Sequence, residues 1–325
     1  MNYLGRRLVR AILLLVGVSA LCFAFTEMAP GSFFDEMRLN PQISPATITS
    51  LEEHYGLNQP LFVRYERWMQ AAAHGDFGYS IAYNTPVAPL LWSRAKNTLL
   101  LTIVAMLLAW LISVPLGVWA AAQHGRMLDK MTGVTSSLFL AVPEVVFAVA
   151  LLAIVVRWRI LPFGGMKSAD FDGLSTWARF WDVAGHMLLP VLILALADGT
   201  IIFRHVRASV LEALEAPFVR ASRSFGISRT RLLFRHVLPV AAGPAISLFG
   251  FSLAGLISGS LLVEVVCGWP GLGPLILDAT LSRDFYLVIG GLIFSALFMI
   301  VGNLIADIML VVADPRIRAG VPDAP

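Results

Sequence analysis

Long apolar runs recur along the chain and are separated by stretches in which the charged residues collect. The runs cover about residues 8–28, 98–122, 131–156, 187–203, 240–263 and 286–313. A helix needs roughly 20 apolar residues to cross the hydrocarbon core of a bilayer, which is about 30 Å thick. The pattern therefore predicts an all-α membrane protein with six transmembrane helices.

The composition is also that of a membrane-embedded chain. Hydrophobic residues make up 58% of the 325 positions and charged residues only 14%, and the mean hydropathy is +0.77. Such values lie well outside the composition of ordinary soluble domains.

The positions of Lys and Arg predict the orientation, because these residues concentrate in short cytoplasmic loops. With the N-terminus inside, fourteen of the 24 Lys and Arg fall on the cytoplasmic side. Both termini are therefore expected to be cytoplasmic. The net charge of +3 reflects this asymmetry, and no basic patch with interleaved aromatics indicates nucleic-acid binding.

The spans divide the chain into parts. We expect an N-terminal transmembrane helix, an external segment, a transmembrane domain that contains a cytoplasmic loop, and a cytoplasmic tail, at residues 1–29, 30–97, 98–314 (loop 204–239) and 315–325. The external segment is long and polar and has an amphipathic stretch at 65–73. Two interpretations stay open for it: a solvated loop, or a docking surface for an external partner.

Residues 204–239, called the basic loop below, hold seven Arg and clear helix punctuation. A helical stretch over 212–225 is expected to be interrupted near Pro217, which suits a first-turn position. Gly226 is expected to end it, since glycine accepts left-handed backbone geometry. Ser228 can then cap a second helix. The loop is thus predicted to hold a short helix across a sharp turn.

The basic loop carries a recognisable motif. It reads Arg220-Ala221-Ser222, then Gly226 after three residues, then His236-Val237-Leu238-Pro239 after nine more. This resembles the cytoplasmic loop signature of ABC importer permeases, whose usual form opens with Glu-Ala-Ala. Here Arg220 and Ser222 replace the first and third letters, and an Arg at the first position is common in the peptide and nickel branch.

Resemblance to that branch extends over nearly the whole chain. Matching blocks occur in the expected order: 4–8 (LGRRL), 55–61 (YGLNQPL), 75–80 (GDFGYS), 115–117 (PLG), Glu264 with 269–273 (WPGLG), and 314–318 (DPRIR). The resemblance implies a type I ABC importer permease in a bacterial inner membrane. It also implies a second homologous permease subunit, two cytoplasmic ATPase subunits and an external solute-binding protein.

The chain lacks the phosphate-binding loop of an ATPase, because none of its three lysines follows the required glycine run. This chain therefore cannot be the ATPase. No cofactor is expected on it, and the resemblance places ATP and magnesium on partner subunits. It implies that the basic loop forms the coupling helix that the ATPases contact. The residues expected to act there are Phe218, Arg220, Ala221, Ser222, Arg223, Phe225, Gly226, Arg229 and Arg231. The alternative is a basic loop that only follows the orientation rule.

Ionisable residues within the spans are candidates for the translocation path, since a charge in the bilayer core is costly. Glu144 lies in the third span beside Pro143, where the resembling branch does not usually place an acid, and Asp198 lies in the fourth. Each either lines the path and favours cationic or amine-bearing cargo, or pairs with a polar group on another helix. Asp307 and Glu264 match acids of the family, for which structural roles are equally open.

The segment 267–273 combines Trp, Pro and three Gly and predicts a tight turn on the external side. Trp269 is the last of the candidate path residues. It either contacts cargo or the docked binding protein, or serves only as an anchor at the membrane interface. Cys22 and Cys267 lie in or beside apolar runs and are expected to be buried hydrophobes, so no metal site is predicted.

The main interpretation is the permease subunit of an ATP-driven importer of peptides or similar small solutes. One alternative keeps the machine and changes the cargo to nickel or another metal chelate. Another class is a proton-coupled secondary transporter that uses Glu144, Asp198 and Asp307. A membrane scaffold or receptor is a third hypothesis, but it leaves the order of the motif at 226–239 unexplained.

Overall fold

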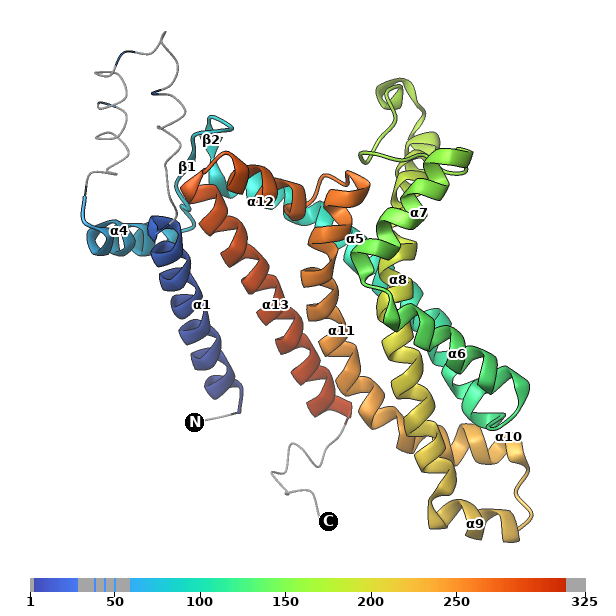
Figure 1. Cartoon of the computed structure of the whole chain (residues 1–325). Coiled ribbons are helices and arrows are strands. Elements are labelled where there is room, and N and C mark those ends of the chain that lie inside the picture. Colours follow the sequence, from blue (N-terminus) through green and yellow to red (C-terminus); the bar gives the residue numbers. More distant parts are fainter. Residues whose placement is uncertain (1–2, 29–37, 39–43, 45–49, 51–58, 314–325) are drawn as a thin grey trace. The chain divides into compact units, whose positions relative to one another are not determined.

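The computed structural model describes residues 3–28, 38, 44, 50 and 59–313, and this part of the chain is mainly helical (Figure 1). The helices that carry the apolar runs are α1 (Tyr3–Met28), α5 (Val87–Ala122), α6 (Met127–Ala141), α7 (Glu144–Trp158), α8 (Thr176–Glu215), α11 (Leu238–Cys267) and α13 (Phe285–Ala313). The remaining elements are α4 (Leu61–Ala73), β1 (Tyr79–Ser80), β2 (Thr85–Pro86), a 3-10 turn (Phe171–Gly173), α9 (Pro217–Ser224), α10 (Arg229–Leu232), a π turn (Leu233–Val237) and α12 (Leu272–Leu281).

Three of the described helices are long and apolar enough to cross a membrane by themselves, namely α5, α8 and α13. Two further spans result if each of the bent pairs, α6 with α7 and the end of α11 with α12, is counted as one. The apolar part of α1, Val9–Phe25, is shorter. The membrane character is confirmed, whereas the number of six spans stays a prediction.

The third apolar run differs from its prediction as a single span. The run splits into α6 and α7, which meet at an angle of 100° at Val142 and Pro143. Glu144 consequently begins α7 instead of lying in the middle of a helix. Pro115 and Pro190, in contrast, lie inside continuous helices.

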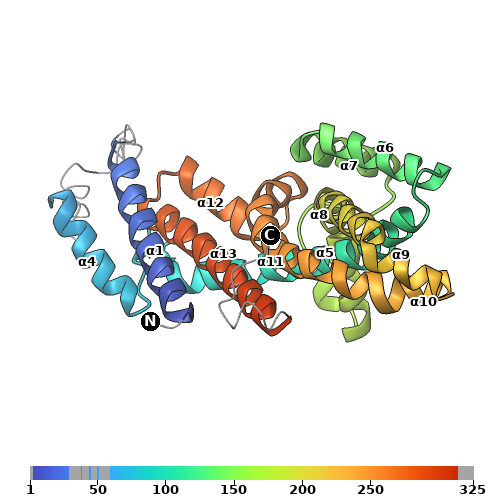
Figure 2. The ribbon, with the colours of Figure 1, turned by 90° about the horizontal axis from the view of Figure 1, so that it is seen from below.

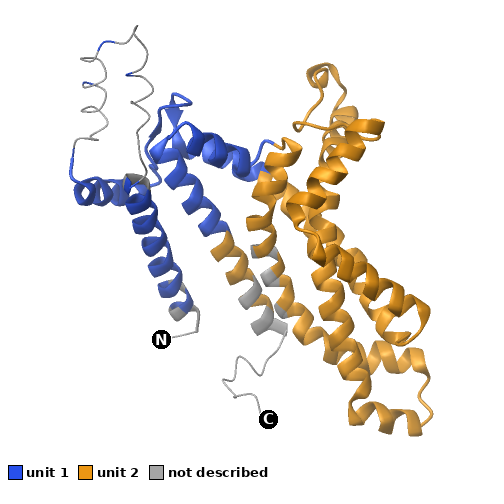
Figure 3. Cartoon of the chain, viewed as in Figure 1, with its two compact units in different colours: residues 1–97, 270–298 blue, residues 98–269, 299–325 orange. Residues whose placement is uncertain are grey.

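The chain forms two compact units (Figure 3). Unit 1 comprises residues 1–97 and 270–298, and unit 2 comprises residues 98–269 and 299–325. In unit 1, Phe23, Trp68 and Ile289 form a buried cluster that joins α1, α4 and α13. The short β1–β2 hairpin is antiparallel, with Ser80 opposite Thr85.

The buried Asp284 holds this hairpin in unit 1. Its Oδ2 accepts hydrogen bonds from the Ser80 hydroxyl at 2.6 Å and from the Ala82 backbone N–H at 3.0 Å. Its Oδ1 accepts from the N–H of Leu287 at 3.3 Å. One carboxylate therefore fixes a turn and caps the start of α13.

Unit 2 is built around α8, which lies between α11 and the α6–α7 pair (Figures 1 and 2). One hydrophobic cluster extends from Leu101 on α5 to Trp269. A second cluster includes Ile202 and Val206 of α8 and Ala121 at the end of α5. Gly117 permits the close approach of α5, because a Cβ at this position would lie 3.0 Å from the Phe203 carbonyl oxygen.

Some predictions fall outside the described residues. They include most of the external block at 55–61, the closing block at 314–318, and the side chain of Asp307. The amphipathic stretch at 65–73 forms most of α4.

Candidate functional site

The basic loop folds as its sequence pattern predicts. Helix α8 ends at Glu215, and α9 begins at Pro217. Proline suits this first position, because a backbone N–H there would have no partner within the helix. Gly226 has a φ of +74°, and its N–H donates to the Arg223 carbonyl. Ser228 is the N-cap residue of α10, although its side chain makes no capping hydrogen bond. Two short helices thus meet at a left-handed glycine turn.

The two faces of this turn have opposite character. Val219 and Leu232 are buried and pack in the second hydrophobic cluster with residues of α8 and the end of α5. Phe225 is 84% exposed, and Phe218 is also exposed. Among the other predicted coupling residues, Ser222 is half-buried. The rest are exposed, namely Arg220, Ala221, Arg223, Gly226, Arg229 and Arg231. The loop therefore presents aromatic and cationic groups from a firmly packed base.

A π turn over Leu233–Val237, which the sequence pattern did not predict, connects α10 to α11. Pro239 has no N–H to bond the carbonyl of Arg235, and its ring crowds that carbonyl, which favours local widening of the helix. Phe234, in this turn, is 63% exposed. Phe234 is thus a further exposed aromatic side chain of the basic loop.

Two polar contacts tie the loop region to its neighbours. Arg229 donates from Nη2 to the carbonyl oxygen of Ala122, the last residue of α5. Arg207 on α8 donates from Nε to Asp129 Oδ1 at 2.5 Å and from Nη2 to Oδ2 at 3.0 Å. Asp129 Oδ2 also lies 2.9 Å from Nδ1 of His124 and accepts from the Gly125 N–H. These contacts join the end of α5, the start of α6 and α8.

Glu144 and Asp198 line one cavity of about 260 Å³ between α7, α8 and α11. Asp198 Oδ2 accepts a hydrogen bond from Ser252 of α11. A Cβ on Gly259 would lie 3.3 Å from Glu144 Oε2, so the glycine leaves room for the carboxylate. The structure thus brings together two of the four predicted path residues, both half-buried.

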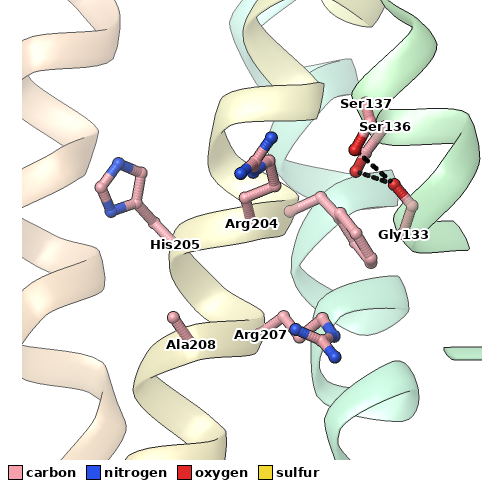
Figure 4. Close-up of a pocket in the computed structure, with 8 residues that line it drawn as sticks. Gly133, Ser136, Ser137, Arg204, His205, Arg207 and Ala208 are labelled. Carbon is pink, nitrogen blue, oxygen red and sulfur yellow. Dashed lines mark hydrogen bonds between the residues drawn. The ribbon is translucent and has the colours of Figure 1, made fainter. Parts of the chain in front are cut away.

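A larger cavity, of about 580 Å³, lies between α6 and α8 (Figure 4). Arg204, His205 and Arg207 contribute from α8, and Ser136 and Ser137 contribute from α6. Both serine hydroxyls donate to the carbonyl of Gly133, as the dashed lines in Figure 4 show. Arg204 was predicted to begin the basic loop, and no cavity was predicted beside it.

Glu264 and Trp269 lie apart from these cavities. Trp269 is fully buried in the first hydrophobic cluster, so the turn that holds it offers no indole surface to a partner in this conformation. The backbone N–H of Trp269 donates to the backbone carbonyl of Glu264 at 2.8 Å, and Gly268 has a φ of +68°. The predicted tight turn is confirmed, and the burial of Trp269 favours a structural anchor over a cargo contact.

The described residues contain no group of three or more His, Cys, Asp or Glu arranged to hold a metal ion. Cys267 is buried and Cys22 is half-buried, and neither forms a disulfide.

Comparison with known proteins decides the family. The model of the "Binding-protein-dependent transport system inner membrane component" family matches residues 113–319. The model of the corresponding N-terminal region matches residues 1–102. The chain belongs to this family. It is therefore a multi-pass protein of the bacterial inner membrane and a permease subunit of an ABC importer.

Curated relatives match along nearly their whole length. The oligopeptide transport permease AppB of Bacillus subtilis is 37% identical, over 97% of this chain and 99% of that protein. The dipeptide transport permease DppB of Escherichia coli K12 is 31% identical, over 98% and 99%. The oligopeptide permease OppB of Mycobacterium tuberculosis H37Rv is also 31% identical, over 98% and 99%. In this family ATP hydrolysis belongs to a separate subunit, so this chain is not an enzyme.

A solved structure supports the fold. The membrane subunit in the inward-facing MetNI methionine ABC transporter aligns with a TM-score of 0.50 at 19% identity. The alignment covers 68% of this chain and 96% of that chain. The predicted type I importer permease fold is thus confirmed.

Proposed function

We propose that this chain forms half of the translocation path for short peptides and couples to separate ATPase subunits through its basic loop. The cargo is inferred from its curated relatives, three of which are named as oligopeptide or dipeptide permeases. Nickel or another metal chelate, carried by the same machine, is the alternative cargo.

The observation that carries the coupling proposal is the two-sided basic loop. Val219 and Leu232 anchor it in the core, while Phe218, Phe225 and Phe234 face outward among arginines. Exposed aromatic side chains within a charged rim are typical of protein interfaces. The buried base gives the loop the rigidity to transmit force, and the Arg229 contact with Ala122 connects it to α5.

In the proposed assembly this permease pairs with a second, homologous permease and with two ATPase subunits that bind ATP and magnesium. A solute-binding protein delivers cargo from outside, and the segment 30–97 is the proposed docking region. The proposed topology has six spans and both termini in the cytoplasm, which puts the basic loop on the ATPase side. This topology rests on the Arg distribution, because positively charged loops remain inside.

Uptake by reconstituted proteoliposomes tests the proposal. Vesicles holding both permeases and both ATPases are supplied with binding protein, labelled tripeptide and internal ATP, and uptake that requires hydrolysable ATP supports the importer. A complex that forms without binding any ATPase would overturn the coupling role. Uptake driven by an imposed proton gradient without ATPase subunits would instead support the secondary transporter.

Phe225→Ala is the most specific variant for the coupling step. The Phe225 side chain is mostly exposed, so its removal should change the stability of the fold little. We expect the variant to bind or stimulate its ATPases less well. Surface variants away from the basic loop, such as Lys130→Gln, serve as controls.

A further inference from the structure

One face of α8 carries opposite charges at two levels. Asp198 and His205 are seven residues apart and therefore lie two turns apart on the same side of the helix. Ile201 lies between them and is exposed, and Arg204 and Ala208 continue the exposed strip. The helix is continuous over this stretch, so the spacing of these residues is fixed.

The upper level of the strip is acidic. Asp198, Glu144 and Ile201 line the 260 Å³ cavity, and no Lys, Arg or His is among its lining residues. Ser252 donates one hydrogen bond to Asp198, which leaves most of the acceptor capacity of the two carboxylates to the cavity.

The lower level is basic, and Arg204 supplies its unbalanced charge (Figure 4). Arg207 lines the same cavity, but its guanidinium is bound to Asp129, so the pair is nearly neutral. Among the described residues Arg204 has no acidic partner. The hydroxyl hydrogens of Ser136 and Ser137 are directed to Gly133, so Arg204 and His205 remain as the donors for an anionic ligand.

The acidic level indicates what this face contacts. Ionisable residues inside membrane spans face a bundle interior or a water-filled cavity, because contact with lipid tails is costly. Asp198 and His205 share a face of α8. Arg204 lies about 120° around the helix from Asp198, with the exposed Ile201 midway, so the basic cavity lies on the same broad polar side as the acidic one. We propose that the two cavities form one bipolar track for a zwitterionic peptide, in which the carboxylates take its ammonium group and Arg204 takes its terminal carboxylate.

The dimensions of the track favour a short cargo. Six to seven residues separate its ends along α8, which corresponds to about 9 to 10.5 Å at 1.5 Å per residue. An extended peptide spans at most about 3.3 to 3.6 Å per residue, so three residues reach about 10 to 11 Å. A tripeptide with both termini free therefore matches the track. This inference rests on the proposed function as a peptide permease.

The test compares a labelled tripeptide with its C-terminally amidated form in proteoliposomes of the complete transporter. Arg204→Gln should lower uptake of the free tripeptide about threefold to tenfold, the range for losing one ordinary hydrogen bond, because solvent weakens the charged contact. Uptake of the amidated peptide should change little. The same binding protein serves every variant, so its own preference cancels when the amide-to-acid ratio is compared between variants.

Arg126→Gln is the matched control, because Arg126 is an exposed arginine outside both cavities. The ratio should stay at its wild-type value there. If the wild-type complex is active and the amide-to-acid uptake ratio is unchanged in Arg204→Gln, the track is wrong but the proposed function stands. A wild-type complex that transports neither peptide overturns the proposed function as well. Loss that follows the anionic-lipid content of the vesicles, and not the peptide carboxylate, identifies a lipid site and also overturns the track.

A labelling experiment locates the cargo independently of uptake. Ile201→Cys, in a chain whose Cys22 and Cys267 are replaced by Ala, should react with a water-soluble thiol reagent, and tripeptide should slow that reaction. Val146→Cys is the control, since Val146 is exposed on α7 but lines neither cavity. Equal rates with and without peptide at Ile201→Cys during turnover contradict the proposal.

Discussion

Arg207 and Asp129 form a two-pronged contact that joins α8 to the first turn of α6, with N–O distances of 2.5 and 3.0 Å. Asp129 is only 4% exposed, and the Gly125 N–H and His124 complete its surroundings. A bidentate guanidinium–carboxylate contact fixes both orientation and distance. The end of α8 that leads into the basic loop is thereby held to α6.

Arg207→Gln should destabilise the protein, because it leaves the Asp129 carboxylate buried without its counter-charge. We expect a loss of roughly 2 to 3 kcal/mol, below the cost for a fully buried pair since Arg207 keeps some contact with solvent. Thermal unfolding in detergent measures the effect. Arg204→Gln, three residues away, should unfold like wild type, and equal unfolding temperatures for all three proteins would show that the contact contributes nothing.

Phe225→Ala and Val219→Ala should have opposite consequences, although both residues lie in the basic loop. Phe225 is 84% exposed, so its loss should leave the unfolding temperature unchanged while it lowers ATPase stimulation. Val219 is fully buried, so its truncation should cost about 1 to 3 kcal/mol of stability. Unfolding curves paired with ATPase assays separate the two, and full stimulation in Phe225→Ala argues against the aromatic contact.

Gly226 should tolerate Asn better than Val. Its φ of +74° costs an ordinary L-residue about 1 to 2 kcal/mol, and a β-branched side chain fares worst. A Cβ at Gly226 would meet nothing within 4 Å, so the effect is one of backbone strain and not of crowding. Uptake and ATP turnover should fall in Gly226→Val and largely persist in Gly226→Asn. Similar activity in both variants would mean that the turn geometry is dispensable.

The sequence predicted the helices better than the breaks between them. Hydropathy locates an apolar run but carries no direction, so it does not give the 100° bend between α6 and α7. Proline is ambiguous here, because Pro115 and Pro190 lie inside continuous helices whereas Pro143 marks a break. What distinguishes them is the packing around each helix, which a single sequence does not contain.

The basic loop was predictable because its signals are local. Pro217 and Gly226 act through backbone geometry within a few residues. The Asp129–Arg207 contact joins residues far apart in sequence and leaves no local signal. The same limit explains Trp269, whose burial depends on helices from elsewhere in unit 2.

Asp284→Asn should loosen the β1–β2 hairpin of unit 1. The carboxylate accepts from Ser80, Ala82 and Leu287, and an amide cannot accept at both of its ends. Hydrogen exchange at Ala82 should become faster, with a loss of about 1 to 3 kcal/mol in local stability. Burial and the nearby Asp278 raise the pKa of Tyr83, so its hydroxyl stays a donor in the variant. Unchanged exchange at Ala82 would contradict this role.

Glu144→Gln should lower uptake of a free tripeptide about threefold, because it removes one of two acids from the cavity while it preserves the shape of the side chain. Gly259→Ala tests the same cavity sterically, since the added Cβ would lie 3.3 Å from Glu144 Oε2 and displace the carboxylate. It should reduce uptake less than Glu144→Gln. Glu212→Gln, an exposed acid on α8 outside the cavity, is the control. Transport at the wild-type rate in Glu144→Gln would remove this residue from the path and leave it a structural partner of its neighbours.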